Sequence, residues 1–95
     1  MMSNIFEENK NKVFRLNEGV FIGDENSDGK SYILNGDKIF ELKGSSSEIL
    51  KVLEKKSLKS EEFLSQLNSK FEGLDEKAAS DFLKFCIVNQ IVVIS

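Results

Sequence analysis

The sequence predicts one small α+β domain in which a three-stranded antiparallel sheet comes first and three helices follow. Two apolar runs flank Asn35-Gly36, a dipeptide that tolerates the positive φ of a tight hairpin turn. After the second run, the spacing of the apolar residues changes from two to about 3.6 residues, the period of a helix. A strand hairpin that leads directly into a helix is therefore the centre of the predicted fold.

The composition and charge of the chain limit the classes of function that it can have. The 95 residues suffice for one domain, and they include one cysteine and no histidine, with a net charge of −3. A single cysteine, no signal-peptide pattern and no long apolar run favour a cytoplasmic protein that does not insert into membranes. The charge is spread evenly, whereas nucleic-acid binding needs a concentrated basic patch. Without histidine, the commonest general base and zinc ligand is missing, so we expect no cofactor, no metal and no catalytic residue.

The start of the chain is polar. We expect residues 1–12 to be flexible, with docking of Ile5 and Phe6 as the alternative. The folded domain is then expected at residues 13–95.

Two short β-like runs precede the hairpin. Val20–Ile22 is predicted as a strand, and Val13–Leu16 is left open. The segment Asp24–Gly29 begins like a calcium-binding loop, but its twelfth position is Asn35 rather than the bidentate Glu that such a loop needs. We therefore predict a solvated hairpin loop that does not bind calcium.

The hairpin arms are predicted at Ser31–Leu34 and Lys38–Leu42, with Tyr32 opposite Ile39. Side chains alternate across a strand. One face then carries Tyr32, Leu34, Ile39 and Glu41, and the other carries Ile33, Phe40 and Leu42. Both faces are partly apolar, so some of this surface is left for a partner.

The first two helices follow directly. The first is predicted at about 46–56, with Ser45 and Glu48 at the spacing of a capping box. The second has Ser60 or a neighbour as its N-cap. Its apolar stripe consists of Phe63, Leu67 and Phe71.

The third helix begins near Asp75 and is apolar over most of its circumference. One broad apolar face carries Ala78, Ala79, Phe82, Leu83 and Cys86. Phe82 is predicted to lie in the core, as is Leu67 of the second helix, and Cys86 is predicted to be a buried, inert thiol. On one side the apolar arc extends beyond what a core needs, so this side either is buried or lines a groove. With a final strand or extended tail at 91–94, the element order is that of a winged helix-turn-helix domain.

Three stretches resemble a known family. They are the strand Ile-Phe-Glu-Leu with the helix Glu-Ile-Leu-Lys-Val-Leu, the helix Glu-Glu-Phe-Leu-Ser-Gln-Leu, and the segment Asp-Phe-Leu-Lys-Phe-Cys-Ile-Val-Asn-Gln-Ile-Val. From about Val20 to Val92, the chain resembles the PqqD family, the peptide chaperones of pyrroloquinoline quinone biosynthesis, and the related recognition elements for ribosomally made, post-translationally modified peptides (RiPPs). It departs at Gln90, where the family usually has Gly, and at Phe85 and Val88, where polar residues are usual.

The resemblance implies binding rather than catalysis. Such domains bind the leader segment of a precursor peptide by adding it as a strand to the sheet, and present the peptide to a modifying enzyme. The implied partners are a leader peptide and a RiPP-modifying enzyme, with neither nucleic acid nor membrane. A monomer or a weak dimer is expected.

The residues and the resemblance together predict a cleft between the last hairpin strand and one flank of the third helix. Its predicted residues are Lys38, Ile39, Phe40, Glu41, Leu42, Asp81, Lys84, Phe85 and Val88. One alternative is a winged-helix DNA-binding transcription regulator, and another is a subunit of a larger complex without a peptide ligand. The third helix carries no net charge and is mostly apolar, which argues against reading a DNA groove.

Overall fold

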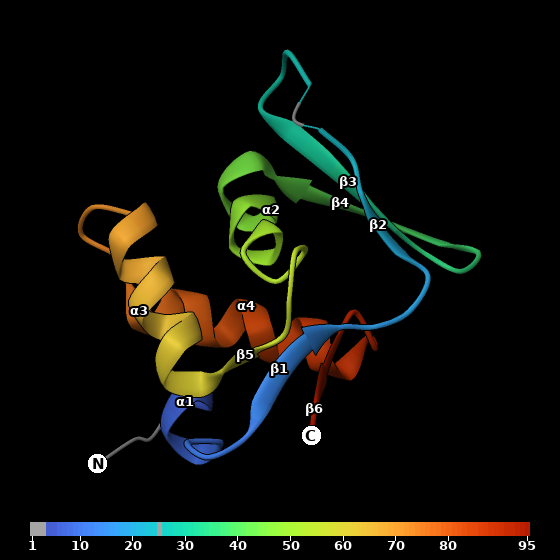
Figure 1. Cartoon of the computed structure of the whole chain (residues 1–95). Coiled ribbons are helices and arrows are strands. Elements are labelled where there is room, and N and C mark those ends of the chain that lie inside the picture. Colours follow the sequence, from blue (N-terminus) through green and yellow to red (C-terminus); the bar gives the residue numbers. More distant parts are fainter. Residues whose placement is uncertain (1–3, 25) are drawn as a thin grey trace.

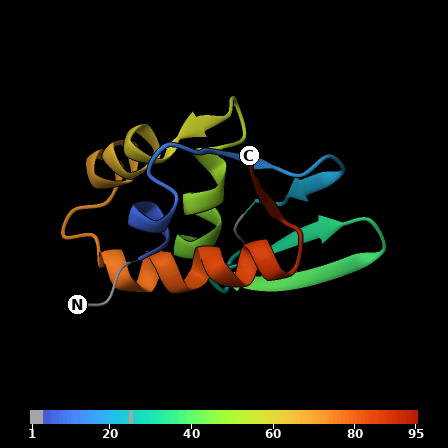
Figure 2. The same cartoon turned by 90° about the horizontal axis from the view of Figure 1, so that it is seen from below.

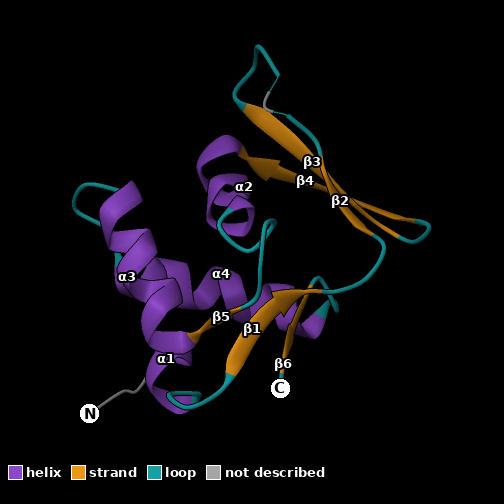
Figure 3. Ribbon diagram, viewed as in Figure 1, coloured by secondary structure: helices purple, strands orange, loops and turns teal. Residues whose placement is uncertain are grey.

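The hairpin lies in a sheet of its own, and a second sheet forms below it (Figures 1 and 3). The computed structural model describes residues 4–24 and 26–95. Within them the elements are α1 Ile5–Glu8, β1 Val13–Leu16, β2 Val20–Ile22, β3 Lys30–Asn35, β4 Lys38–Lys43, α2 Gly44–Lys51, β5 Leu58–Lys59, α3 Ser60–Lys70, α4 Glu76–Val88 and β6 Val92–Ile94. The α+β class is thus confirmed, with four helices in the described chain instead of three. None of these helices is long and apolar enough to cross a membrane.

The upper sheet has the order β2-β3-β4 and is antiparallel. Its hairpin is confirmed, but the predicted register is wrong by two residues, because Tyr32 lies opposite Glu41 rather than Ile39. The two-residue loop is Gly36-Asp37, and Gly36 has a φ of 64°. Gly at the first central position is typical of a type II′ turn, which explains the shift. A shift by two leaves every side chain on its predicted face, because the strand period is two.

The lower sheet has the order β5-β1-β6. The segment left open, Val13–Leu16, is therefore a strand, but it belongs to this sheet and not to the sheet of the hairpin. Leu16 pairs with Val92 of β6, and Phe14 pairs with Leu58 of β5. These partners are distant in the sequence, so the local pattern that predicts a strand did not predict its sheet.

Residues 1–12 were expected to be flexible. For the described residues of this segment the prediction is wrong, because α1 docks on the core. The first three residues lie outside the described chain. Ile5 and Phe6 are both buried. The backbone N–H of Ile5 donates to Ser80 Oγ at 2.9 Å, and Ser60 Oγ donates to the carbonyl of Phe6 at 2.7 Å. The folded domain therefore includes α1 rather than beginning at residue 13.

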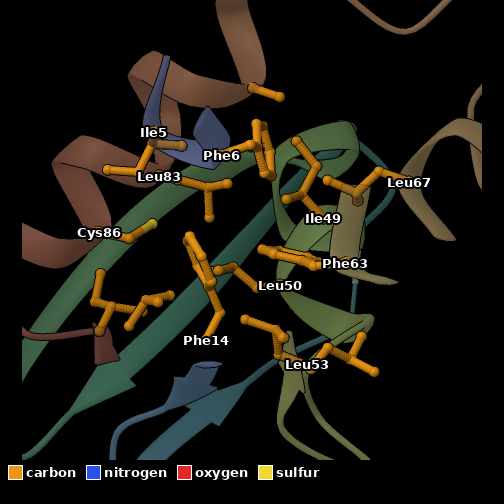
Figure 4. Packing of buried hydrophobic residues seen from close by; sticks show 14 of the residues in the cluster. Ile5, Phe6, Phe14, Ile49, Leu50, Leu53, Phe63, Leu67, Leu83 and Cys86 are labelled. Carbon is orange, nitrogen blue, oxygen red and sulfur yellow. The ribbon is translucent and has the colours of Figure 1, made fainter. Parts of the chain in front are cut away.

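One apolar core joins both sheets and all four helices (Figure 4). Three rings meet at its centre, with Phe14 and Phe63 5.4 Å apart and Phe6 and Phe63 5.9 Å apart between centroids. Leu67 is fully buried, as predicted. Phe82, also predicted as core, is only partly buried and packs at the edge of the cluster.

The first turn of α2 differs from the prediction. The helix begins and ends earlier than the predicted 46–56, and its N-cap is Lys43. The predicted capping box is wrong, because Ser45 lies inside the helix and Glu48 pairs with Lys70 at 2.8 Å instead. The hydrogen bond from Lys70 is the main cause that lowers the pKa of Glu48.

Helix α4 has well-defined ends. Asp75 is its N-cap, as predicted, and accepts the N–H of the third helical residue at 3.1 Å. At the other end, Gln90 has a φ of 60°, the only positive value for a residue other than Gly in the described chain. The N–H of Ile91 reaches the carbonyl of Cys86 at 2.8 Å, and that of Gln90 reaches Ile87 at 3.1 Å. This bond pair is a Schellman motif, in which Gln90 takes the left-handed position usually held by Gly.

Candidate functional site

Strand β4 is an edge of the upper sheet: within the described chain it pairs with β3 alone. The N–H of Gly23 donates to the carbonyl of Tyr32 at 2.8 Å, and the N–H of Asn26 donates to that of Lys30 at 2.7 Å. Tyr32 and Lys30 thus turn their backbone groups away from β4, and in an antiparallel pair the residues opposite them turn away as well. The β4 residues whose backbone groups face the open edge are therefore Ile39, Glu41 and Lys43.

The C-terminal half of α4 lies alongside this edge (Figure 2). The rings of Phe40 on β4 and Phe85 on α4 are perpendicular, with centroids 5.9 Å apart. Phe82 stacks on Phe85 at 6.5 Å. Phe85 is still 41% exposed and Val88 is 80% exposed, so this flank of α4 keeps apolar surface in contact with solvent. An open strand edge therefore lies next to an exposed apolar helix flank.

Two hydrogen bonds from one side chain connect the hairpin to the end of α4. Asn35 Nδ2 donates to the carbonyls of Asn89 and Gln90, both at 3.1 Å. The sequence assigned Asn35 to the turn, whereas it is the last residue of β3. No local pattern indicates that this amide reaches the distant helix end, so sequence reasoning missed it.

The five predicted residues Lys38–Leu42 all lie on the edge strand. Ile39, 66% exposed, and Glu41 project from the outer face of the sheet. Glu41 Oε1 is 3.1 Å from Lys30 Nζ, and this hydrogen-bonded pairing raises the pKa of Lys30. Phe40 projects from the inner face and is half-buried.

The predicted residues of α4 divide between two flanks. Asp81, Phe85 and Val88 are exposed, and Asp81 lies one helical turn before Phe85. Lys84 is not brought to β4, because its Nζ lies 3.8 Å from Glu8 Oε1 of α1. The flank next to β4 includes Phe82 instead, which sequence reasoning placed in the core.

Two observations concern the chemistry of the described residues: the state of the cysteine and the grouping of possible metal ligands. Cys86 is a buried free thiol, and burial raises its pKa from 9.0 to about 12. A thiol with such a pKa is a poor nucleophile near neutral pH. Among the described residues, no group of three His, Cys, Asp or Glu side chains could hold a metal ion.

The segment Asp24–Gly29 is a loop between β2 and β3, apart from Glu25, which lies outside the described residues. Asn26 Oδ1 accepts the N–H groups of Asp28 at 2.9 Å and Lys30 at 3.1 Å. Gly29 has a φ of 75°, in the left-handed region that favours glycine. The side chain of Asn26 therefore stabilises the turn itself.

No protein-family model, curated protein sequence or solved structure matches the chain. The open edge of β4, with the adjacent flank of α4 that carries Phe85 and Val88, is the candidate site and is called the β4–α4 surface below.

Proposed function

We propose that this protein binds an extended peptide by strand addition to the open edge of β4, and that it presents the bound peptide to a modifying enzyme. The peptide is the leader segment of a precursor, as the resemblance to the PqqD family implies. In this proposal the protein has no catalytic activity of its own.

One observation carries the proposal: the open edge of β4 lies directly beside the exposed apolar flank of α4. Backbone groups at Ile39, Glu41 and Lys43 can hydrogen-bond an added strand whatever its sequence. An added strand would also turn alternate side chains toward Phe85 and Val88, which supply the apolar contacts that select among sequences. Backbone pairing thus gives affinity and the flank gives specificity.

The arrangement of elements also supports a winged-helix interpretation, in which the β3–β4 hairpin is the wing and α2, α3 and α4 are the helices. A DNA-binding role is less favoured. Helix α4 exposes Phe85 and Val88 rather than a row of basic or amide side chains, and one of its two lysines is paired with Glu8.

The test begins with a random 12-residue peptide library displayed on phage and selected on the full chain. Amide hydrogen exchange of the protein is then followed by NMR with and without a recovered peptide. We expect exchange at Ile39, Glu41 and Lys43 to slow at least tenfold, because these N–H groups gain partners. Exchange at Phe40 and Leu42 should change much less, because their N–H groups already face β3.

Protection confined to another surface, or failure to recover any binding peptide, would contradict strand addition at β4. A salt titration against random-sequence duplex DNA provides the second arm. Binding that weakens steeply with salt would favour the DNA alternative instead.

A further inference from the structure

A cavity of about 280 Å³ lies between the start of α2, the α3–α4 loop and the first half of α4. Its main lining side chains are Ser45, Ile49, Phe71, Leu74, Ala78 and Phe82. Phe71, Leu74 and Phe82 are only partly buried, and Ala78 is exposed. The core thus leaves a concave apolar surface open to solvent at this point.

The lining determines which group fits. It contains no Lys or Arg but includes Glu72 and Asp75, so a negatively charged group is disfavoured. The side chain of Asp75 is already engaged as the N-cap of α4. The volume is near the lower limit of about 300 Å³ for small-molecule sites, which suits a group the size of one amino-acid side chain. The occupant that fits is a neutral aliphatic or aromatic side chain.

The cavity adjoins the β4–α4 surface through a chain of ring contacts. Phe82 lines the cavity, stacks on Phe85, and Phe85 in turn contacts Phe40 of β4. Along the chain, β4 ends at Lys43 and Ser45 follows almost at once. A strand paired with the open edge would therefore arrive at the cavity a few residues past Lys43.

We propose that this cavity is an anchor pocket for one aliphatic or aromatic side chain of the bound peptide, just outside the segment that pairs with β4. This inference rests on the proposed function and adds to it the class of residue that the peptide must carry and where. Peptides that bind the protein should share such a residue at a constant distance from their paired segment.

The first test does not depend on any peptide. N-acetyl-leucinamide and N-acetyl-phenylalaninamide are titrated into the labelled full-length protein and followed by NMR, with N-acetyl-glycinamide as the control. We expect saturable shifts of the amide signals of Ser45 and Ala78 with the first two compounds only. Ala78→Leu places extra apolar atoms in the cavity and should weaken fragment binding at least tenfold, whereas Lys77→Leu, on the neighbouring exposed position, should not. Absence of saturable shifts would overturn the inference.

The second test uses the peptides recovered from the library. Ala78→Leu should weaken their binding at least tenfold, while Lys77→Leu should change it less than twofold, with circular dichroism confirming that both variants fold. If Phe85→Ala weakens binding but Ala78→Leu does not, the anchor pocket is refuted and the proposed function stands. If the fragments bind but no peptide is recovered, the proposed function fails, and the pocket fails with it as a peptide anchor.

Discussion

Replacement of Phe85 by Ala separates a binding role from a structural one. The ring is 41% exposed and packs against Phe40 and Phe82, two partly buried residues at the rim of the core. Burying a whole Phe side chain contributes about 1.5–3 kcal/mol, so the buried part of this ring, with its two ring contacts, should contribute about 1–2 kcal/mol. That corresponds to a decrease in melting temperature of roughly 4–15 °C for a domain of this size.

Phe85→Ala should cost more in binding free energy than in folding stability. An aromatic anchor at a binding surface typically costs about 2 kcal/mol or more when truncated, so we expect Phe85→Ala to weaken peptide binding at least tenfold. Fluorescence polarisation with a labelled library peptide measures this at a temperature where the variant is folded. Phe21→Ala is the matched control, because Phe21 is also exposed but lies on β2, at the opposite edge. Unchanged affinity in Phe85→Ala would refute peptide binding at the β4–α4 surface, and a loss in Phe21→Ala would point to the β2 edge instead.

Three further predictions concern stability. Leu67→Ala should lower the free energy of unfolding by about 2–5 kcal/mol, because it leaves a cavity at a fully buried site; an unchanged denaturation curve would contradict this. Gln90→Gly should raise the free energy of unfolding by about 0.5–1 kcal/mol by relieving the positive φ, as thermal denaturation can test, and a lower melting temperature would show that the Gln side chain matters. Burial in the folded state raises the pKa of Cys86 from 9.0 to about 12. Below pH 9 the thiol is neutral in both the folded and the unfolded state. Between pH 9 and 12 it ionises only in the unfolded state, so the free energy of unfolding decreases over this range. Urea titrations should therefore show a decrease of about 1.4 kcal/mol per pH unit above pH 9 that is missing in Cys86→Ala, and equal slopes in the two proteins would refute it.

The part of the fold that depends on local chemistry could be predicted from the sequence. Strand alternation placed Ile33 and Ile39 on opposite faces of the sheet, and this held although the register was wrong. The alternation did not say which face is buried; in the structure Ile33 is buried and Ile39 is exposed. Asp75 was predicted as an N-cap because its side chain acts on an N–H three residues away. Such features succeed because the interacting groups are neighbours in the sequence.

The part that depends on distant partners could not be predicted. Ile5 and Phe6 stand in a polar segment, and nothing nearby indicates that α3 and α4 offer them a buried site through Ser60 and Ser80. Similarly, the run at Val13–Leu16 predicts a strand, but its partners are set by the way the chain returns at its C-terminus. The hydrogen bonds from Asn35 to the end of α4 also join residues that are distant in the sequence, so they could not be predicted either.

Helix α4 shows both a feature that the sequence could predict and one that it could not. Helical spacing placed Phe85 and Val88 on a side of α4 that the core does not need, and both side chains are indeed exposed. The spacing could not say which elements lie beside each flank, because that depends on how the buried residues rotate the helix. Once Leu83 and Cys86 face the core, α1 lies beside the flank of Lys84, and Phe40 of β4 packs against Phe85 on another flank. In the proposed peptide-binding site, selectivity should consequently depend on aromatic contacts more than on the lysine that the sequence suggested.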